Sequence, residues 1–110
     1  FERYRRLLKA ASQRFRDLGI ANVTPIFEDG RDGFASGSPY HRIVIHSAFP
    51  APPKQFLDQL APHGALICAI GPGDGEQMLV RLKKIGSRFE REDIGPVRYQ
   101  AIAFGKADVL

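Results

Sequence analysis

Short apolar runs separated by turn residues limit what this chain can fold into. Residues 41–46 and 65–70 have nearly continuous apolar centres, and a short helical segment at 54–60 lies between them. Such runs are typical of strands that are covered on both faces. The alternation of strand, helix and strand is typical of α/β folds. Residues 78–84 and 88–92 mix apolar and charged positions around a short turn, which predicts a hairpin. The sequence therefore predicts an α/β fold with a mainly parallel sheet and antiparallel C-terminal strands.

The two ends of the chain contribute a helix and further strands. Apolar residues recur at three- and four-residue steps over residues 2–18, and Gly19 follows them. This pattern predicts an amphipathic helix that ends in a left-handed glycine. Residues 23–27 are predicted to form a short strand in which Pro25 lacks a ladder donor, and residues 97–104 a last strand.

Length, charge and cysteine content exclude several classes of protein. The 110 residues suffice for one domain, and no apolar stretch approaches the about 20 residues of a membrane-spanning helix. Cys68 is the single cysteine, so no internal disulfide can form, and we expect a buried thiol and a cytoplasmic location. The net charge is +4, and much of the excess lies in the first helix, as a solvated face or as a contact for phosphates.

Patterns for metal binding or nucleophilic catalysis are not found. His41 and His46 are five residues apart on one predicted strand and so face opposite sides. The cluster at residues 71–75 lacks the lysine and hydroxyl residue of a phosphate loop, and it predicts a turn. No catalytic residue and no metal site is therefore predicted.

Two acidic positions indicate a ligand site. Asp29 and Gly30 follow the strand predicted at 23–27, and ligands of open α/β sheets bind beyond the carboxyl ends of strands. There Asp29 can accept an N–H from a heterocycle that Gly30 lets approach the backbone, or the pair simply forms a turn. Glu2 precedes the first helix, where dinucleotide-type folds place a carboxylate on ribose hydroxyls. The alternative for Glu2 is a charge that favours the helix N-terminus.

A larger set of segments carries a family resemblance. In chain order they are residues 2–4, 18–23, 28–30, 38–45, 47–50, 56–64, 71–77, 89–92 and 95–99. In order and spacing, this set resembles about the second half of a protein-L-isoaspartate O-methyltransferase. The resemblance implies a Rossmann-like class I methyltransferase fold, truncated here, with residues 1–110 forming the C-terminal part of a single methyltransferase-like domain.

The resemblance also implies a reaction and a site. The family transfers a methyl group from S-adenosylmethionine to the carboxylate of isoaspartyl residues in damaged proteins, a protein-repair reaction. Positioning supplies most of the catalysis, because the carboxylate is already a nucleophile and the sulfonium carries the activated methyl group. By resemblance, the residue matching Glu2 holds the ribose hydroxyls and Arg3 lies near the adenine. The remaining implied positions are Asp29 and Gly30 at the adenine edge and Val97, Arg98 and Tyr99 near the substrate peptide.

Some positions depart from the family pattern. They are Glu28, His41 and His46. In addition, the family's glycine-rich cofactor loop and its serine-containing substrate segment have no counterpart in the chain. We therefore expect the isolated chain to be inactive and to bind S-adenosylmethionine weakly or not at all. The alternatives are a non-enzymatic remnant of the fold that acts in protein interaction, and a methyltransferase-like module that contacts RNA through the arginine-rich helix.

The expected partners are isoaspartyl-containing proteins or peptides, and neither a membrane nor a nucleic acid. In the family's sheet the strand matching residues 23–27 has a neighbour that this chain lacks. We consider three alternatives for this strand: it pairs with residues 43–45, another chain supplies its neighbouring strands, or the neighbour belongs to a longer protein. Unpaired strand edges of this kind allow self-association.

Overall fold

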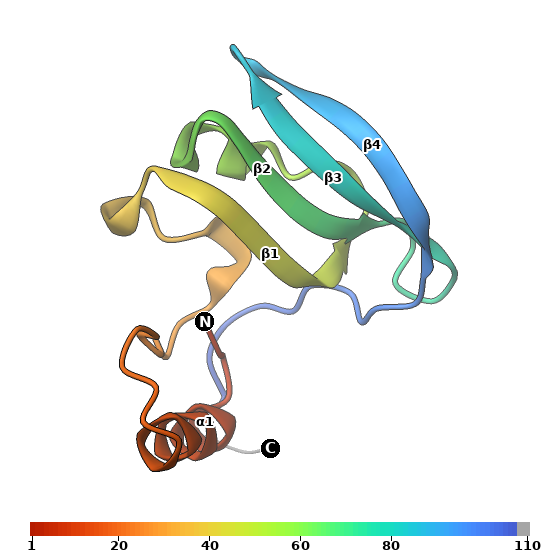
Figure 1. Cartoon of the computed structure of the whole chain (residues 1–110). Helices are drawn as coiled ribbons and strands as arrows, with labels where there is room; N and C mark the ends of the chain where they lie inside the picture. Colours follow the sequence, from red (N-terminus) through yellow and green to blue (C-terminus); the bar gives the residue numbers. More distant parts are fainter. Residues whose placement is uncertain (108–110) are drawn as a thin grey trace. The chain divides into compact units, whose positions relative to one another are not determined.

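Residues 1–107 are described by the computed structural model, and they divide into two units (Figure 1). Unit 1 consists of Phe1–Arg31 together with residues 103–107, so that both ends of the chain contribute to it. Unit 2 consists of Asp32–Ile102. Among residues 1–107, no helix has the length and hydropathy that crossing a bilayer would require.

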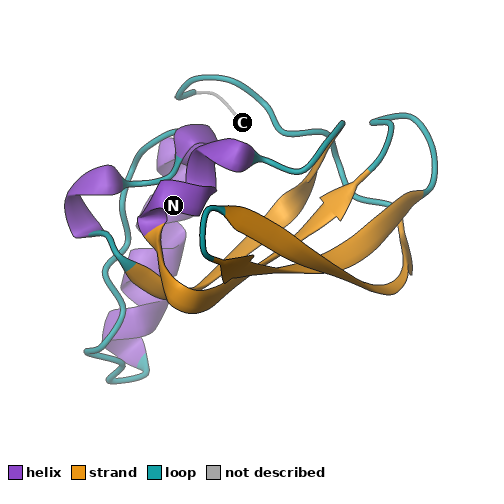
Figure 2. Ribbon diagram, turned by 90° about the horizontal axis from the view of Figure 1, so that it is seen from above, coloured by secondary structure: helices purple, strands orange, loops and turns teal. Residues whose placement is uncertain are grey.

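Unit 2 is built on one twisted four-stranded sheet (Figures 1 and 2). Its strands, in spatial order, are β1 (Tyr40–Phe49), β2 (Leu60–Ile70), β3 (Gln77–Ile85) and β4 (Arg88–Val97). β1 pairs with β2 in parallel, whereas β2 with β3 and β3 with β4 pair in antiparallel fashion. The α/β class and the antiparallel C-terminal strands are confirmed, and the sheet as a whole is mixed.

The hairpin and the connecting helix lie where the sequence predicts them. β3 and β4 pair as far as Ile85 and Arg88, and Gly86 between them has φ +61°, a conformation that glycine adopts without strain. The predicted helix at residues 54–60 is the 3-10 helix η3 (Lys54–Gln59). Two further short 3-10 helices, η1 (Gly30–Asp32) and η2 (Ala35–Gly37), occupy the polar segment before β1.

Residues 62–64 form a bulge within β2. Tyr40 pairs with Leu60 but Arg42 pairs with Ala65, so the β2 backbone between these pairs is longer than its partner. His63 takes up the excess with φ 62°. A Cβ atom at Gly64 would lie 2.8 Å from the Ala61 carbonyl oxygen, so the bulge requires glycine there.

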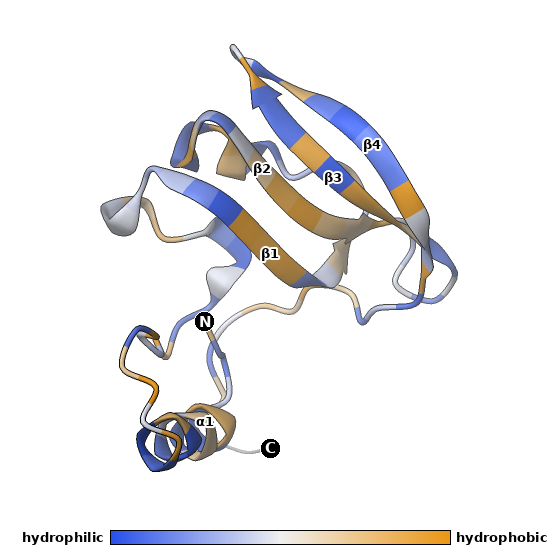
Figure 3. Cartoon of the chain, in the orientation of Figure 1, coloured by the Kyte–Doolittle hydropathy of each residue, from blue (hydrophilic) through white to orange (hydrophobic). Residues whose placement is uncertain are grey.

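The core of unit 2 lies on one face of this sheet. Its buried side chains are Phe49, Phe56, Leu60, Leu66, Cys68, Val80 and Leu82. Figure 3 shows the hydrophobic middle of β1 and β2 that contributes to it. Burial raises the pKa of the Cys68 thiol to about 11, and the expected buried thiol is confirmed. The coverage of β1 on both faces is wrong, because Val44 is 57% exposed while its neighbours Ile43 and Ile45 pack against the core.

Unit 1 contains the predicted amphipathic helix, α1 (Arg5–Asp17). Gly19 follows it with φ +67°, which confirms the left-handed end. The helix has no buried residue, and Leu7 and Leu18 are 40% and 73% exposed. Its apolar stripe is therefore only partly covered, because Leu8, Ala11 and Phe15 are half-buried.

Two predicted strands are wrong. Of residues 23–27 only Phe27 forms a bridge, and its parallel partner is Glu2 rather than residues 43–45. Pro25 removes a ladder donor there, and the contact with Glu2 is a single bridge. β4 ends at Val97, and beyond it Ala101 bridges to Ala48. In place of the strand expected at 97–104, the backbone at Tyr99 hydrogen-bonds to the Gln77 side chain.

Candidate functional site

The four predicted cofactor residues all lie in unit 1. Glu2 and Phe27 form a parallel bridge, in which the Glu2 N–H donates to the Ile26 carbonyl oxygen at 3.1 Å. Arg3 follows Glu2 directly, and Asp29 lies two residues beyond Phe27. Because the two paired segments run in the same direction, the bridge brings both acidic residues to the same end of the pairing. The two segments therefore lie side by side, although the strand predicted at residues 23–27 is nearly absent.

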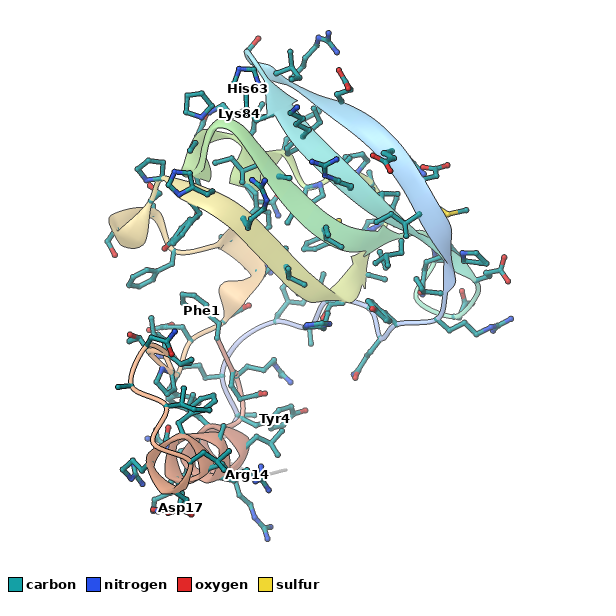
Figure 4. The ribbon with its side chains drawn as sticks, viewed as in Figure 1. Phe1, Tyr4, Arg14, Asp17, His63 and Lys84 are labelled. Atoms are coloured by element: carbon teal, nitrogen blue, oxygen red, sulfur yellow. The ribbon has the colours of Figure 1, made fainter. Side chains whose placement is uncertain are left out.

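The Glu2 carboxylate lies at the beginning of α1. Its Oε1 accepts the Tyr4 N–H at 2.9 Å, and Tyr4 is the residue that precedes the helix. A carboxylate at this position is favoured by the unpaired N–H groups and the dipole of the helix. This contact matches the alternative reading of Glu2 as a charge that favours the helix N-terminus. Phe1 and Tyr4, labelled in Figure 4, flank Glu2 and Arg3 in the chain.

The Asp29 carboxylate accepts two backbone N–H groups. Oδ1 accepts from Arg31 at 2.9 Å, which is the local turn contact expected of Asp-Gly, and Oδ2 accepts from Gly105 at 2.8 Å. Burial acts to raise the pKa of Asp29, but the hydrogen bonds from Gly105 and Arg31 and the charges of Arg31 and Arg3 outweigh it and lower the pKa below its usual value. Asp29 is thus held as an anion that accepts N–H donors.

Arg3 and Gly30 complete the set. The Arg3 guanidinium donates to two carbonyl oxygens, from Nε to Gly105 at 2.9 Å and from Nη2 to Phe104 at 3.1 Å. A Cβ atom at Gly30 would lie 3.2 Å from the Cβ of Phe1, so the Phe1 side chain is the neighbour of this glycine. Residues 103–107, named the tail from here on, therefore contact this group directly.

The predicted substrate residues lie in unit 2. Val97 is the last residue of β4 and pairs with Gln77, while Arg98 is exposed. The Tyr99 N–H donates to Gln77 Oε1 at 2.6 Å, and Gln77 Nε2 donates to the Tyr99 carbonyl oxygen at 3.0 Å. The Tyr99 ring lies 6.4 Å from that of His46. The segment is an extended backbone fixed at Tyr99 rather than a strand.

Gln77 is a residue that sequence reasoning missed. Its side chain is almost fully buried and also donates to the Pro72 carbonyl oxygen at 2.7 Å, so both of its N–H donors and its oxygen are used. At the end of the β3–β4 ladder, the Gln77 side chain makes the hydrogen bonds that a further pair of strand residues would otherwise make. The signal that would have found it is a lone amide that opens an apolar strand directly after the glycine-rich turn at residues 71–75.

Chemically, the unit 1 group combines acceptors with a donor. The Asp29 and Glu2 carboxylates accept N–H or O–H groups, and the Arg3 guanidinium donates to oxygen or nitrogen. A ligand with an amine, ring nitrogens and vicinal hydroxyls matches this set. Across residues 1–107, no group of three or more His, Cys, Asp or Glu residues is placed to hold a metal ion.

Comparisons with known proteins agree with one another. A family model described as protein-L-isoaspartate(D-aspartate) O-methyltransferase matches residues 1–107. The protein-L-isoaspartate O-methyltransferase of Parvibaculum lavamentivorans is 41% identical, over 96% of this chain and 49% of the relative. That of Azorhizobium caulinodans is 38% identical, over 99% of this chain and 50% of the relative. The chain thus spans about half the length of these curated relatives.

Solved structures share the fold. A Plasmodium falciparum protein described as a protein-L-isoaspartate O-methyltransferase, crystallised with S-adenosyl-L-homocysteine, superposes with a TM-score of 0.76 at 19% identity. The match covers 93% of this chain and 50% of that one. A second protein-L-isoaspartate O-methyltransferase gives a TM-score of 0.80 at 24% identity, covering 91% of this chain and 32% of that one.

Proposed function

Because the chain belongs to the protein-L-isoaspartate O-methyltransferase family, we propose that it takes part in methyl transfer from S-adenosylmethionine to the carboxylate of isoaspartyl residues in damaged proteins. In this proposal residues 1–110 are the C-terminal part of a single methyltransferase-like domain. The incomplete burial of the apolar side of α1 supports it, since a stripe of that kind normally packs fully against another layer. So does the span of about half of each relative.

The observation that carries the cofactor assignment is the bridge between Glu2 and Phe27. It pairs the segment of Glu2 and Arg3 with the segment that leads to Asp29, and Arg3 and Asp29 both contact Gly105. The carboxylates and the guanidinium of these segments match the donors and acceptors of an adenosine, which supports the assignment. We assign Glu2 to the ribose hydroxyls, and Arg3, Asp29 and Gly30 to the adenine. When bound, S-adenosylmethionine supplies an activated methyl group; the protein's part is to bind and orient.

The substrate side is assigned to Val97, Arg98 and Tyr99. Gln77 holds the Tyr99 backbone from both its N–H and its carbonyl side, so the segment keeps one conformation before a peptide arrives. Positioning of this kind is the main contribution that the protein makes to such a reaction. Isoaspartyl-containing proteins or peptides are the proposed partners.

Self-association and location complete the proposal. β1 lies at the edge of the sheet and Val44 is 57% exposed, which supports association through that edge. Light scattering of the purified chain between about 10 µM and 1 mM tests this. We further propose a cytoplasmic location, which the single buried Cys68 supports.

A titration with S-adenosylhomocysteine tests the cofactor assignment. We expect the isolated chain to bind it with a dissociation constant above about 10 µM, because half of the relatives' length is not represented. A dissociation constant of about 10 µM corresponds to a binding free energy near −7 kcal/mol. Glu2→Gln and Asp29→Asn should each weaken binding by about tenfold. Asp17→Asn is the matched control, since it removes an exposed carboxylate in the same unit. Equal binding by all three variants would contradict the assignment.

A methylation assay tests the reaction itself. The chain with labelled S-adenosylmethionine and an isoaspartyl peptide should give no turnover above a blank, whereas a longer family member should methylate that peptide and leave its aspartyl form unmodified. Turnover by the isolated chain would show that it contains a complete active site.

A further inference from the structure

The tail binds the same side chains that the cofactor would use. Asp29 Oδ2 accepts the Gly105 N–H at 2.8 Å, and the Arg3 guanidinium donates to the Gly105 and Phe104 carbonyl oxygens at 2.9 and 3.1 Å. Gly105 therefore presents to unit 1 both an N–H donor and a carbonyl acceptor. An adenine edge offers the same pairing of an amine donor with ring acceptors.

Further contacts fix the tail on either side of Gly105. The Arg31 guanidinium lies over the Phe104 ring, 4.1 Å from its centroid. The Lys106 Nζ is 3.4 Å from Glu28 Oε1. The backbone then pairs in parallel with Tyr4: the Ala107 N–H donates to the Arg3 carbonyl oxygen at 2.7 Å, and the Arg5 N–H donates to the Ala107 carbonyl oxygen at 3.1 Å.

Glu28 gains a role from this arrangement. It departs from the pattern of the family that the sequence resembles, and its carboxylate faces a tail lysine. The negative charge of Glu28 is complementary to the charge of Lys106. The departure thus favours the docked tail.

From these contacts we propose that residues 103–107 form an intramolecular competitor of the cofactor, so that the docked tail and a bound adenosine exclude each other. The inference rests on the proposed function, because it assumes that Asp29 and Arg3 receive the adenine. A ligand N–H that needs Asp29 Oδ2 must displace the Gly105 N–H, and a ligand acceptor that needs Arg3 must displace two carbonyl oxygens.

The tail is suited to reversible release. The Lys106 and Glu28 side chains are 46% and 47% exposed, so their ion pair lies at the surface. Gly105 has φ +73°, and glycine is the residue that changes its backbone conformation most readily. A competitor of this kind weakens the apparent affinity by the fraction of molecules in which the tail is released. Variants that release the tail should therefore bind the cofactor more tightly.

The test uses the full 110-residue chain, labelled with nitrogen-15 and titrated with S-adenosylhomocysteine. Gly105→Pro removes the N–H that Asp29 accepts and cannot adopt the positive φ, and Lys106→Glu sets two carboxylates against each other. Each should bind about five- to tenfold more tightly than the parent chain. Lys9→Glu makes the same charge change at an exposed position of α1 and should leave the affinity unchanged.

A second readout follows the tail itself. In the parent chain without ligand, the Gly105 amide should exchange with solvent slowly, and saturating S-adenosylhomocysteine should make its exchange fast. Unchanged amide signals from Cys68 and Leu82 in each variant show that unit 2 remains folded.

The outcomes separate the two proposals. Equal affinity of the parent chain and both tail variants, or a protected Gly105 amide at saturation, would overturn the competitor and leave the cofactor site standing. No binding by any variant, with the Gly105 amide still protected, would overturn the cofactor site and the competitor with it.

Discussion

The interactions that stabilise unit 2 internally differ from those that stabilise unit 1 internally. In unit 2, large apolar side chains such as Leu66, Val80 and Leu82 have no exposed surface, and Phe49 and Phe56 pack edge to face at 6.2 Å. In the described part of unit 1 no residue is buried. Its contacts are hydrogen bonds to charged side chains and cations over aromatic rings, including Arg5 over Phe27 at 4.4 Å and Arg31 over Phe104.

This contrast bears on the unit that contains the proposed cofactor residues. A buried large apolar side chain contributes about 1.5–3 kcal/mol, whereas a cation over a ring at an exposed site contributes about 0.5–1 kcal/mol. The proposed cofactor residues thus lie in the unit with the weaker contacts. Segments that bind ligands and rearrange are commonly drawn from the less stable parts of a structure. Four measurements, ordered by expected effect, challenge this comparison.

Truncation of a leucine in each unit gives the largest contrast. Leu82→Ala should lower the free energy of unfolding by about 2–5 kcal/mol, because it leaves a cavity in the unit 2 core. Leu7→Ala, at a 40% exposed position of α1, should change it by no more than about 0.5 kcal/mol. Urea denaturation followed by circular dichroism measures both. A cost at Leu7 equal to that at Leu82 would show that the Leu7 side chain is buried as deeply as the core of unit 2.

Removal of the Gln77 amide should have the next largest effect. Gln77→Leu leaves the backbone groups of Tyr99 and Pro72 without their partner, at a cost of about 1–3 kcal/mol. The exchange of the Tyr99 amide should become faster. Gln100→Leu, an exposed position in the same segment, is the control and should change neither quantity.

Acid should release the tail. The pKa of Asp29 is lowered in the folded chain, so its contribution to docking is complete above its usual value of 3.8 and is lost as the pH falls through the lower folded value. The Gly105 amide signal, followed from about pH 6 to pH 2, should report this loss.

Two variants separate Asp29 from its neighbour. Glu28→Gln should leave most of the transition in place. Asp29→Asn should abolish it. A transition that disappears only with Glu28→Gln would assign tail release to the Lys106 ion pair instead.

The exposed ion pairs should have the smallest effect, and a similar one in both units. Glu92→Gln in unit 2 removes a 3.5 Å pair with Arg81, and Lys106→Gln in unit 1 removes the 3.4 Å pair with Glu28. Each should cost less than about 1 kcal/mol and less still at high salt. A larger loss of stability for one variant would show that an ion pair contributes to the difference in stability between the two units.

Sequence reasoning succeeded where the signal is local. Helix periodicity and Gly19 fixed α1 to within a few residues, and the hairpin of β3 and β4 followed from its alternation. It failed where pairing depends on distant partners. Residues 23–27 look like a strand, but only Phe27 pairs, and residues 97–104 yield to the Gln77 side chain.

The candidate site divides in the same way. That Glu2 and Asp29 lie at one end of a pairing was predictable, because a parallel arrangement follows from the fold class. That the tail binds them was not. Phe104, Gly105 and Lys106 carry no local pattern, and their contacts with Arg3, Asp29 and Glu28 join opposite ends of the sequence.

The discontinuous make-up of unit 1 has a consequence for the order of folding. Its two segments are separated by Asp32–Ile102, and closing a flexible loop of about 70 residues costs roughly 4 kcal/mol of chain entropy. Surface contacts such as those of the tail do not recover that cost easily. A folded intervening segment fixes the separation of its own ends and removes most of it. The tail should therefore dock only after Asp32–Ile102 has folded, and it should be the first part of the molecule to come apart.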